Sequence, residues 1–398
     1  MSDDLVSSDT TPLTPPRSDD DRVSWLRLYR SRGVGVHTFY RLIGEHGDAA
    51  TVLAHLPDLA ARAGVTDYAA ASVQAVEREM RAARKAGARL VCRGEAAYPA
   101  LLATIDDPPP LLWVRGDTGL FARPAVAMVG ARNASALGER TARHLSEGIG
   151  ALGHVLVSGL ARGIDAAAHE AALATGTIAV LGGGVDVSYP SENAKLQGRI
   201  AERGLLVSEQ PMGLAPQARH FPRRNRIIAG IARALVVVEA AARSGSLITA
   251  RNAAEQGREV LVVPGHPFDG RAAGCNMLIR DGATLVRGKG DIAEALGIDA
   301  QANATPDTSP PETARNRPKA RAPARRTASE TPAPQATATT PAAAAHRAIL
   351  ERLGPTPTPE DHLCRATGLP PAALAPALLD LEFDGRICRH PGGLVSRA

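Results

Sequence analysis

Apolar and polar positions follow a repeating pattern through the middle of this chain, from residue 88 to about residue 298. Short runs of apolar, often β-branched residues recur there, and a segment with helical spacing follows each run. The runs occupy residues 125–130, 154–159, 177–182, 204–209, 234–239 and 259–265, and residues 283–288 form a weaker seventh. Because the runs are apolar throughout, they predict strands buried on both faces. Strands that alternate with helices predict an α/β fold with a doubly wound parallel sheet.

A different pattern precedes this region. Over residues 23–87 the apolar positions recur at helical spacing, which predicts a small helical domain. Within it, Gly33-Val34-Gly35 comes directly before a helix and resembles the turn of a helix–hairpin–helix or SAM-like domain, although a plain helical turn is the simpler interpretation. Residues 1–22 are polar and rich in Asp and Pro, so we expect a disordered tail.

The chain continues past the α/β region with a linker and a third domain. Residues 299–343 are rich in Pro, Ala and Thr and have no periodicity, which predicts an extended linker. Residues 344–398 contain three helical segments and then two short strands around Pro391-Gly392-Gly393. Three helices followed by a β-hairpin predict a winged-helix domain.

Charge and cysteine content restrict the possible functions. The chain has 398 residues and a net charge of +5, and only four of its 46 basic residues are lysine. An excess of arginine suits a nucleic-acid partner, but GC-rich codons produce the same bias. The four cysteines lie far apart without metal-ligand spacing, so we expect no metal site. There is no signal peptide and no apolar run near the ~20 residues that span a bilayer, so we expect a cytoplasmic protein without membrane contact.

The turn after the first strand of the α/β region, residues 130–138, argues against a nucleotide cofactor. A dinucleotide site needs G-x-G-x-x-G, and Arg132 stands where the second glycine would lie after Gly130. The second strand ends in Ser158-Gly159 rather than in an acidic residue for a ribose, and no P-loop sequence occurs. We therefore expect no cofactor. The turn still predicts a helix N-terminus that faces a phosphate, with Arg132 beside it.

Other strand ends carry similar loops, rich in glycine and serine with interspersed arginine. Because parallel strands share a direction, these loops should emerge at one edge of the sheet and form a surface that binds anions. The alternative is that each glycine serves only a tight turn. The candidate residues in these loops are Ser158, Gly159, Arg162, Gly163, Gly183, Arg243, Ser244, Gly245 and Ser246.

The segment from residue 220 to residue 230 combines an aromatic residue with a cluster of cations. Phe221 is one of only five phenylalanines in the chain, and it comes directly before Pro222 and then Arg223, Arg224, Asn225 and Arg226. Bases of a single strand stack on aromatic rings while arginines contact the phosphates. The alternative is a buried Phe221 beside a solvated group of arginines.

Over about residues 95–290 the sequence resembles the DNA-processing protein A family, also called DprA or Smf. The resemblance depends on several ordered blocks, which include VGARNAS, SGLARGID, GGGVDVSYPSEN, LVSEQPMG, FPRRNRIIAG, VVEAAARSGSLITARNAAEQGREV and VPGHPFDGRAAGCNMLIRDGA. The helical N-terminal region and the winged helix also fit the layout of this family. Two mild departures are the triplet at residues 182–184 and the stretch at residues 266–269.

The resemblance implies an extended Rossmann-like fold that binds single-stranded DNA and is not an enzyme. It further implies a homodimer that loads the recombinase RecA and protects incoming DNA during natural transformation. By motif position, the DNA pocket would be lined by Arg132, Phe221, Arg224, Arg226 and residues 243–246.

Two other functions stay open. The fold also resembles that of the lysine-decarboxylase-like phosphoribohydrolases, which are nucleotide-processing enzymes with a P-G-G-x-G-T-x-x-E motif. That motif is absent here, although Glu239 and Glu255 are candidate general acids. A pure scaffold for other recombination proteins is the third alternative, and oligonucleotide binding by the purified protein distinguishes it from the first.

Overall fold

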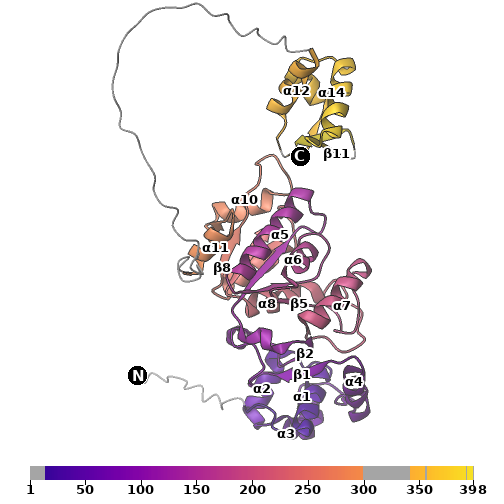
Figure 1. The fold of residues 1–398 in the computed structure, drawn as a ribbon. Helices are drawn as coiled ribbons and strands as arrows, with labels where there is room; N and C mark the ends of the chain where they lie inside the picture. The colour runs from indigo at the N-terminus through magenta and orange to yellow at the C-terminus, as the bar shows by residue number, and fades with distance from the viewer. Residues whose placement is uncertain (1–13, 299–340, 355, 391, 398) are drawn as a thin grey trace, which may run out of the picture. The chain divides into compact units, whose positions relative to one another are not determined.

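The computed structural model describes residues 14–298, 341–354, 356–390 and 392–397. These residues form two separate compact units, one on each side of the gap after residue 298, and each is described by itself (Figure 1). The linker predicted at residues 299–343 lies outside the described residues except for its last three, and so does the predicted tail over residues 1–13.

The first unit is built on a nine-stranded sheet with the order β1-β2-β6-β5-β4-β3-β7-β8-β9. From β6 to β9 all neighbours are parallel, and β1 and β2 add an antiparallel pair at one edge. The strands are β1 (Arg89–Cys92), β2 (Leu111–Gly116), β3 (Ala125–Gly130), β4 (Val155–Ser158), β5 (Thr177–Val180), β6 (Leu205–Ser208), β7 (Ala234–Val238), β8 (Glu259–Val262) and β9 (Thr284–Leu285). All seven predicted strands are present. The sheet is mixed rather than purely parallel. Its antiparallel strands, β1 and β2, were not predicted because they lie outside the pattern of alternating strands and helices.

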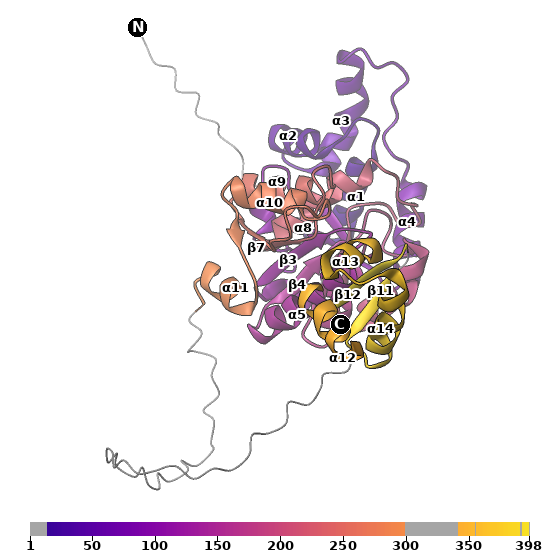
Figure 2. The ribbon, with the colours of Figure 1, turned by 90° about the horizontal axis from the view of Figure 1, so that it is seen from above.

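Helices cover both faces of this sheet. Figure 2 shows α8, α9 and α10 on one face, and α5 and α11 on the other. Side chains alternate along each strand, so Val126 and Met128 pack against α5 and α6, whereas Ala127 and Val129 pack toward α8 and α9. The helices are α5 (Ala136–Ala151), α6 (Ile164–Ala172), α7 (Ala194–Arg203), α8 (His220–Ile231), α9 (Ser246–Glu255), α10 (Ala273–Arg280) and α11 (Lys289–Ala295). This arrangement confirms the predicted doubly wound, Rossmann-like fold.

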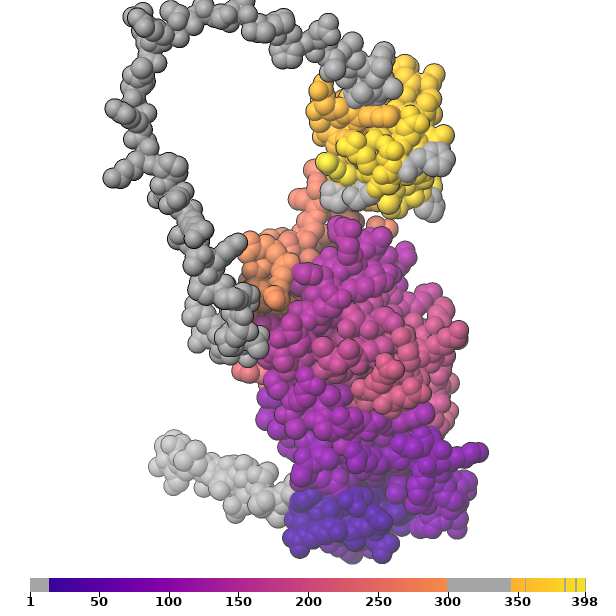
Figure 3. All heavy atoms as spheres, viewed as in Figure 1, coloured from indigo at the N-terminus to yellow at the C-terminus, as the bar shows by residue number. Residues whose placement is uncertain are grey.

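The predicted helical domain consists of α1 (Asp19–Arg30), α2 (Val36–His46), α3 (Ala49–Arg62) and α4 (Val73–Lys85). Helix α1 begins four residues before the predicted start at residue 23, because Ser18 and Asp21 form a capping box. The turn at Gly33 uses a positive φ of 79° and leads into α2. Trp25 and Phe39 share a core with Leu206 of β6, so these helices pack directly against the sheet (Figure 3).

The second unit is a winged helix, as predicted. It contains α12 (Pro341–Arg352), α13 (Glu360–Thr367) and α14 (Pro371–Phe383), and a sheet with the order β10-β12-β11. Its strands are β10 (Thr358–Pro359), β11 (Ile387–His390) and β12 (Leu394–Arg397). Ile349, Leu363, Leu378 and Val395 form its own buried core. In neither unit does a described helix have the length and apolar character to cross a membrane.

Candidate nucleic-acid interface

Two hollows lie at the carboxyl edge of the parallel strands. Strands β3 and β7 are neighbours, but the chain leaves them toward opposite sides of the sheet, and this is where ligands bind in doubly wound folds. The first hollow, here the switch-point cavity, has a volume of about 680 Å³. The second, here the Tyr189 cavity, has a volume of about 370 Å³ and lies over the ends of β4 and β5.

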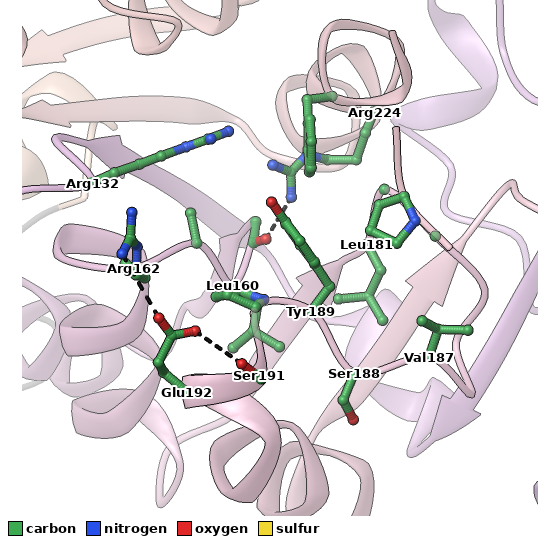
Figure 4. Close-up of a pocket in the computed structure, with 17 residues that line it drawn as sticks. Arg132, Leu160, Arg162, Leu181, Val187, Ser188, Tyr189, Ser191, Glu192 and Arg224 are labelled. Atoms are coloured by element: carbon green, nitrogen blue, oxygen red, sulfur yellow. Dashed lines mark hydrogen bonds and ion pairs between the residues drawn. The ribbon is translucent and has the colours of Figure 1, made fainter. Parts of the chain in front are cut away.

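Four residues line both cavities: Arg132, Ala161, Phe221 and Arg224. The guanidinium carbon of Arg132 lies 5.1 Å from the centre of the Phe221 ring, and that of Arg224 lies 5.9 Å from it. Figure 4 shows Arg132, Tyr189 and Arg224 converging on the Tyr189 cavity from three different segments. The predicted association of Phe221 with arginines therefore exists as a packed cluster with cation–π geometry.

Arg224 is a buried member of this cluster. Only 7% of the residue is exposed, and its Nη1 donates hydrogen bonds of 2.6 Å to the carbonyl oxygens of Gly159 and Val180. Burial lowers the pKa of Arg224 to about 10, and Asp165 opposes this shift. Arg224 is thus charged at neutral pH and holds two strand ends together as well as lining the pocket.

The glycines of these loops make room for their neighbours. A Cβ atom on Gly159 would lie 2.1 Å from Nη1 of Arg224, and one on Gly130 would lie 2.0 Å from the carbonyl oxygen of Val238. At Gly163 and Gly183 a Cβ atom would also collide with backbone oxygens. A side chain would therefore not fit at these four residues. Gly130 lines the switch-point cavity, and Gly159 and Gly183 line the Tyr189 cavity, so these close-packed glycines also stand at the candidate interface.

The N-terminus of α5 is not free to hold a phosphate, contrary to the sequence-based expectation. The Glu239 carboxylate accepts a hydrogen bond of 2.9 Å from the Ser135 backbone N–H and another from the Ser135 hydroxyl. A Cβ on Gly138 would lie 2.4 Å from the carboxyl carbon of Glu239. Glu239 therefore supplies the negative charge that this helix end favours. Glu239 directly follows β7 and lies 104 residues further along the chain than Ser135, so no local motif reveals the contact.

Arg226 does not line either cavity, and its prediction as part of the pocket is corrected. Residues 224 and 226 lie about 200° apart around α8, so their side chains point to opposite sides. The Arg226 guanidinium donates to both carboxylate oxygens of Glu209 at 2.7 and 2.8 Å, and to the carbonyl oxygen of Asp107 at 2.7 Å. Its side chain is 11% exposed.

The remaining candidate residues divide between the cavities and other surroundings. Arg243, Ser244, Gly245, Ser246 and Asn225 line the switch-point cavity, and Arg162 lines the Tyr189 cavity. Arg162 lies 3.7 Å from Glu192. Ser158 is buried and donates to the carbonyl oxygen of Met128, and Arg223 is exposed beside Asp106 and Asp107, outside both cavities.

Two aromatic or basic cavity residues were missing from the predicted set. Tyr189 follows β5 and lines the Tyr189 cavity, where its ring lies 5.7 Å from that of Phe221. Arg271 follows β8 and lines the switch-point cavity. Both stand in loops that follow parallel strands, at the same edge as the glycine-rich loops. Their position after a predicted strand was therefore a signal for them in the sequence.

The switch-point cavity has a positive lining. Arg132, Arg243 and Arg271 are exposed, and none lies within ion-pair distance of a carboxylate in the part of the chain that the structure describes. Asp165 also lines the cavity, but its carboxylate accepts from the backbone N–H groups of Gly159 and Ala161. The described residues contain no cluster of His, Cys, Asp and Glu suited to a metal ion. This arrangement fits a polyanion.

Comparison with known proteins identifies the family. A model of DNA recombination-mediator protein A matches residues 89–297, and models of the DprA-like N-terminal HHH domain and the DprA winged helix match residues 19–82 and 331–393. The chain belongs to the DNA recombination-mediator protein A family, which confirms the resemblance to DprA and Smf.

Individual relatives agree with this assignment. The chain is similar to protein Smf of Escherichia coli, with 38% identity over 301 residues, which is 75% of this chain and 74% of that one. It is similar to DNA processing protein DprA of Streptococcus pneumoniae, with 47% identity over 197 residues, or 49% of this chain and 70% of that one. The X-ray structure of DprA from Streptococcus pneumoniae matches with a TM-score of 0.53 and 41% identity, over 56% of this chain and 77% of that one.

Proposed function

We propose that this protein binds single-stranded DNA across the two cavities and acts as a recombination mediator that protects the strand and transfers it to RecA during natural transformation. The observation that supports DNA binding is the Arg132–Phe221–Arg224 cluster, which presents cations and an aromatic ring between two hollows. An unpaired base can enter a hollow and stack on a ring, whereas the bases of a duplex are already stacked. The family description as a recombination mediator supports the transfer to RecA.

The protein acts as a binding protein rather than as an enzyme under this proposal. Glu239, one of the two candidate general acids, is held at the N-terminus of α5 by Ser135. The other, Glu255, lies at the end of α9 and lines neither cavity. The proposed place of action is the cytoplasm, where RecA would be met.

A homodimer is part of the proposal. Strand β9 forms one edge of the sheet, and Leu285 on it and Met277 on α10 expose 42% and 39% of their surface. Exposed apolar side chains that lie together can be covered by a second chain, and two-fold dimers are the commonest closed oligomers. Sedimentation that shows only monomer at micromolar concentration would contradict this.

Oligonucleotide binding across a range of salt concentrations tests the central claim. We expect tighter binding to a single strand than to a duplex of the same length. We also expect a log–log salt slope of about −0.7 for each phosphate neutralised. A slope near zero, or equal affinity for duplex, would reject the proposed interface.

A further inference from the structure

We propose that Tyr189 and Phe268 are base-stacking platforms at the two ends of the DNA path, and that the strand runs from Tyr189 past Phe221 to Phe268. This inference rests on the proposed function and extends it by assigning the ends of the path. Neither residue belongs to the set predicted from the sequence.

The first observation is where the exposed aromatic rings are. Tyr189 exposes 49% of its surface and Phe268 exposes 94%. Every other aromatic residue whose side chain the structure describes is buried or half-buried. Both exposed rings stand in loops at the carboxyl edge of the sheet, one after β5 and one after β8. A phenylalanine ring left almost entirely in water loses the burial that normally stabilises it, so its place on a binding edge suggests a ligand that covers it.

The second observation is that the loop of Phe268 is joined to the switch-point cavity. Asp269 accepts a hydrogen bond from the Arg271 backbone N–H at 2.9 Å, and the Arg271 side chain lines that cavity. The His266 ring lies 5.6 Å from the Phe268 ring. The loop thus offers an aromatic face and a cation three residues apart, and this is the combination that a base and its phosphate require.

The third observation concerns the opposite end of the path. Tyr189 lines the smaller cavity, with its ring 5.7 Å from the Phe221 ring and tilted by 35°. Phe221 in turn carries Arg132 over its face. Tyr189, Phe221 and Phe268 therefore supply three aromatic surfaces. Arg132, Arg243 and Arg271 line the switch-point cavity, which Phe221 also lines, and none of the three has a carboxylate partner among the described residues.

The order of strands gives the length of this path. Four steps across the sheet, β5-β4-β3-β7-β8, separate the strand before Tyr189 from the strand before Phe268. At about 4.8 Å per step this is roughly 19 Å. A stacked single strand that rises ~3.4 Å per nucleotide covers that distance with about five or six nucleotides.

Length-dependent binding tests the inference. Oligothymidylates of about 3, 6 and 12 nucleotides are titrated into the full-length protein and its variants. We expect Phe268→Ala to weaken binding of the two longer strands about 5- to 100-fold and to change binding of the shortest strand little, since that strand cannot reach from the central cluster to both ends. Phe268→Trp should retain wild-type affinity because it keeps a stacking face. Tyr189→Ala should weaken binding of all three strands, because the Tyr189 ring lies only 5.7 Å from that of Phe221 and even the shortest strand reaches it. Tyr189→Phe should retain wild-type affinity. Val73→Ala, which shortens an exposed apolar side chain on α4, is the matched control.

The possible results separate this inference from the proposed function. If Phe268→Ala and Tyr189→Ala bind all three strands like the wild type while Arg132→Ala binds weakly, the end platforms are rejected and the central interface stands. If Arg132→Ala also binds normally, the proposed function itself fails. If Phe268→Ala changes the sedimentation coefficient and leaves DNA affinity intact, the ring contacts a second copy of the chain, which also overturns the stacking role.

Discussion

Arginine serves opposite purposes in two regions of this protein. At the junction between the N-terminal helices and the sheet, Arg226 and Arg30 each face a carboxylate. Arg226 binds both oxygens of Glu209, which also accepts from the Tyr29 hydroxyl, and Arg30 lies 2.9 Å from Glu79. At the carboxyl edge, Arg132, Arg243 and Arg271 have no such partner among the described residues. The comparison shows that the surroundings of an arginine, rather than its membership in a motif, decide whether its charge is free for a phosphate.

The largest expected effect, a loss of stability, comes from replacing one arginine in each region with alanine. Arg226→Ala leaves Glu209 buried without its partner, so we expect it to reduce the free energy of unfolding by about 3–5 kcal/mol. Arg132→Ala removes an exposed side chain and should change that free energy by no more than about 0.5 kcal/mol. For DNA affinity the order should be reversed, with a clear loss for Arg132→Ala. Denaturant unfolding and oligonucleotide titration of both variants measure the two quantities.

Two results would remove the distinction between the regions. One is a stable Arg226→Ala variant that binds DNA poorly, which would return Arg226 to the interface. The other is an Arg132→Ala variant that unfolds easily. Arg226→Lys is the control for charge alone. Lysine keeps the charge but cannot reproduce the planar guanidinium, whose Nη2 donates to Glu209 while Nη1 donates to the Asp107 carbonyl oxygen.

Phe221 provides the next largest effect, because it lies at the centre of the carboxyl edge. If a base stacks on its ring, Phe221→Ala should reduce the binding free energy by about 1–3 kcal/mol and leave thermal stability nearly unchanged. Phe221→Leu is the matched control, since it fills a similar volume without an aromatic face. Lower thermal stability with unchanged affinity would show instead that Phe221 is a core residue.

Arg224 combines features of the two regions, because it lies at the carboxyl edge yet is buried. Its charge also acts on the buried His169, and the pH dependence of stability tests that effect. Burial, aided by the charge of Arg224, lowers the pKa of His169 to about 3. In the folded protein its Nδ1 lies 2.7 Å from the Thr177 hydroxyl oxygen, and its Nε2 has no partner among the described residues. Below about pH 6.5 the unfolded chain binds a proton that the folded protein does not.

Stability should therefore fall as the pH decreases from about 6.5 toward 3, by about 1.4 kcal/mol per pH unit from this residue. Replacing His169 with Gln should remove that share of the slope, whatever it does to the absolute stability. Denaturant unfolding of wild type and variant at several pH values in this window gives both slopes. Equal slopes would mean that His169 titrates alike in both states.

Sequence reasoning succeeded where a feature is local and failed where it is not. Seven of the nine strands of the sheet were predicted, because each is an apolar run followed by a segment with helical spacing. Strands β1 and β2 were missed because only a short 3-10 turn, and no such helix, follows each of them. The pairing of Arg226 with Glu209 could not be predicted, since it depends on which side of α8 faces the N-terminal helices. The period of an α-helix does separate residue 224 from residue 226, however, so treating residues 220–231 as a helix would have placed the two arginines on different sides. Tyr189 and Arg271 lie at strand ends that the analysis had already identified.

The smallest expected effect is that of removing the winged-helix unit. We expect this unit to contribute little to DNA affinity. A winged helix usually reads DNA with its third helix, here α14. That helix contains Asp380 and Glu382 and has no lysine or arginine, so phosphates would be repelled. On the wing, Arg389 lies 3.4 Å from Glu382 and 3.7 Å from Glu360, so its charge is largely matched within the unit.

From residue 346 onward the sequence carries six arginines and six acidic residues, which leaves no net positive field to attract DNA. A chain that ends after about residue 300 should therefore keep its single-strand affinity within about twofold of the full-length value. A twofold change is about 0.4 kcal/mol of binding free energy, which is less than the ~1–3 kcal/mol expected for Phe221→Ala. A tenfold loss would show that the basic residues before α12 or the winged helix itself hold DNA. A salt titration of residues 341–398 alone would then distinguish these sources, because a winged helix that binds phosphates should show a negative log–log slope and one that does not should show none.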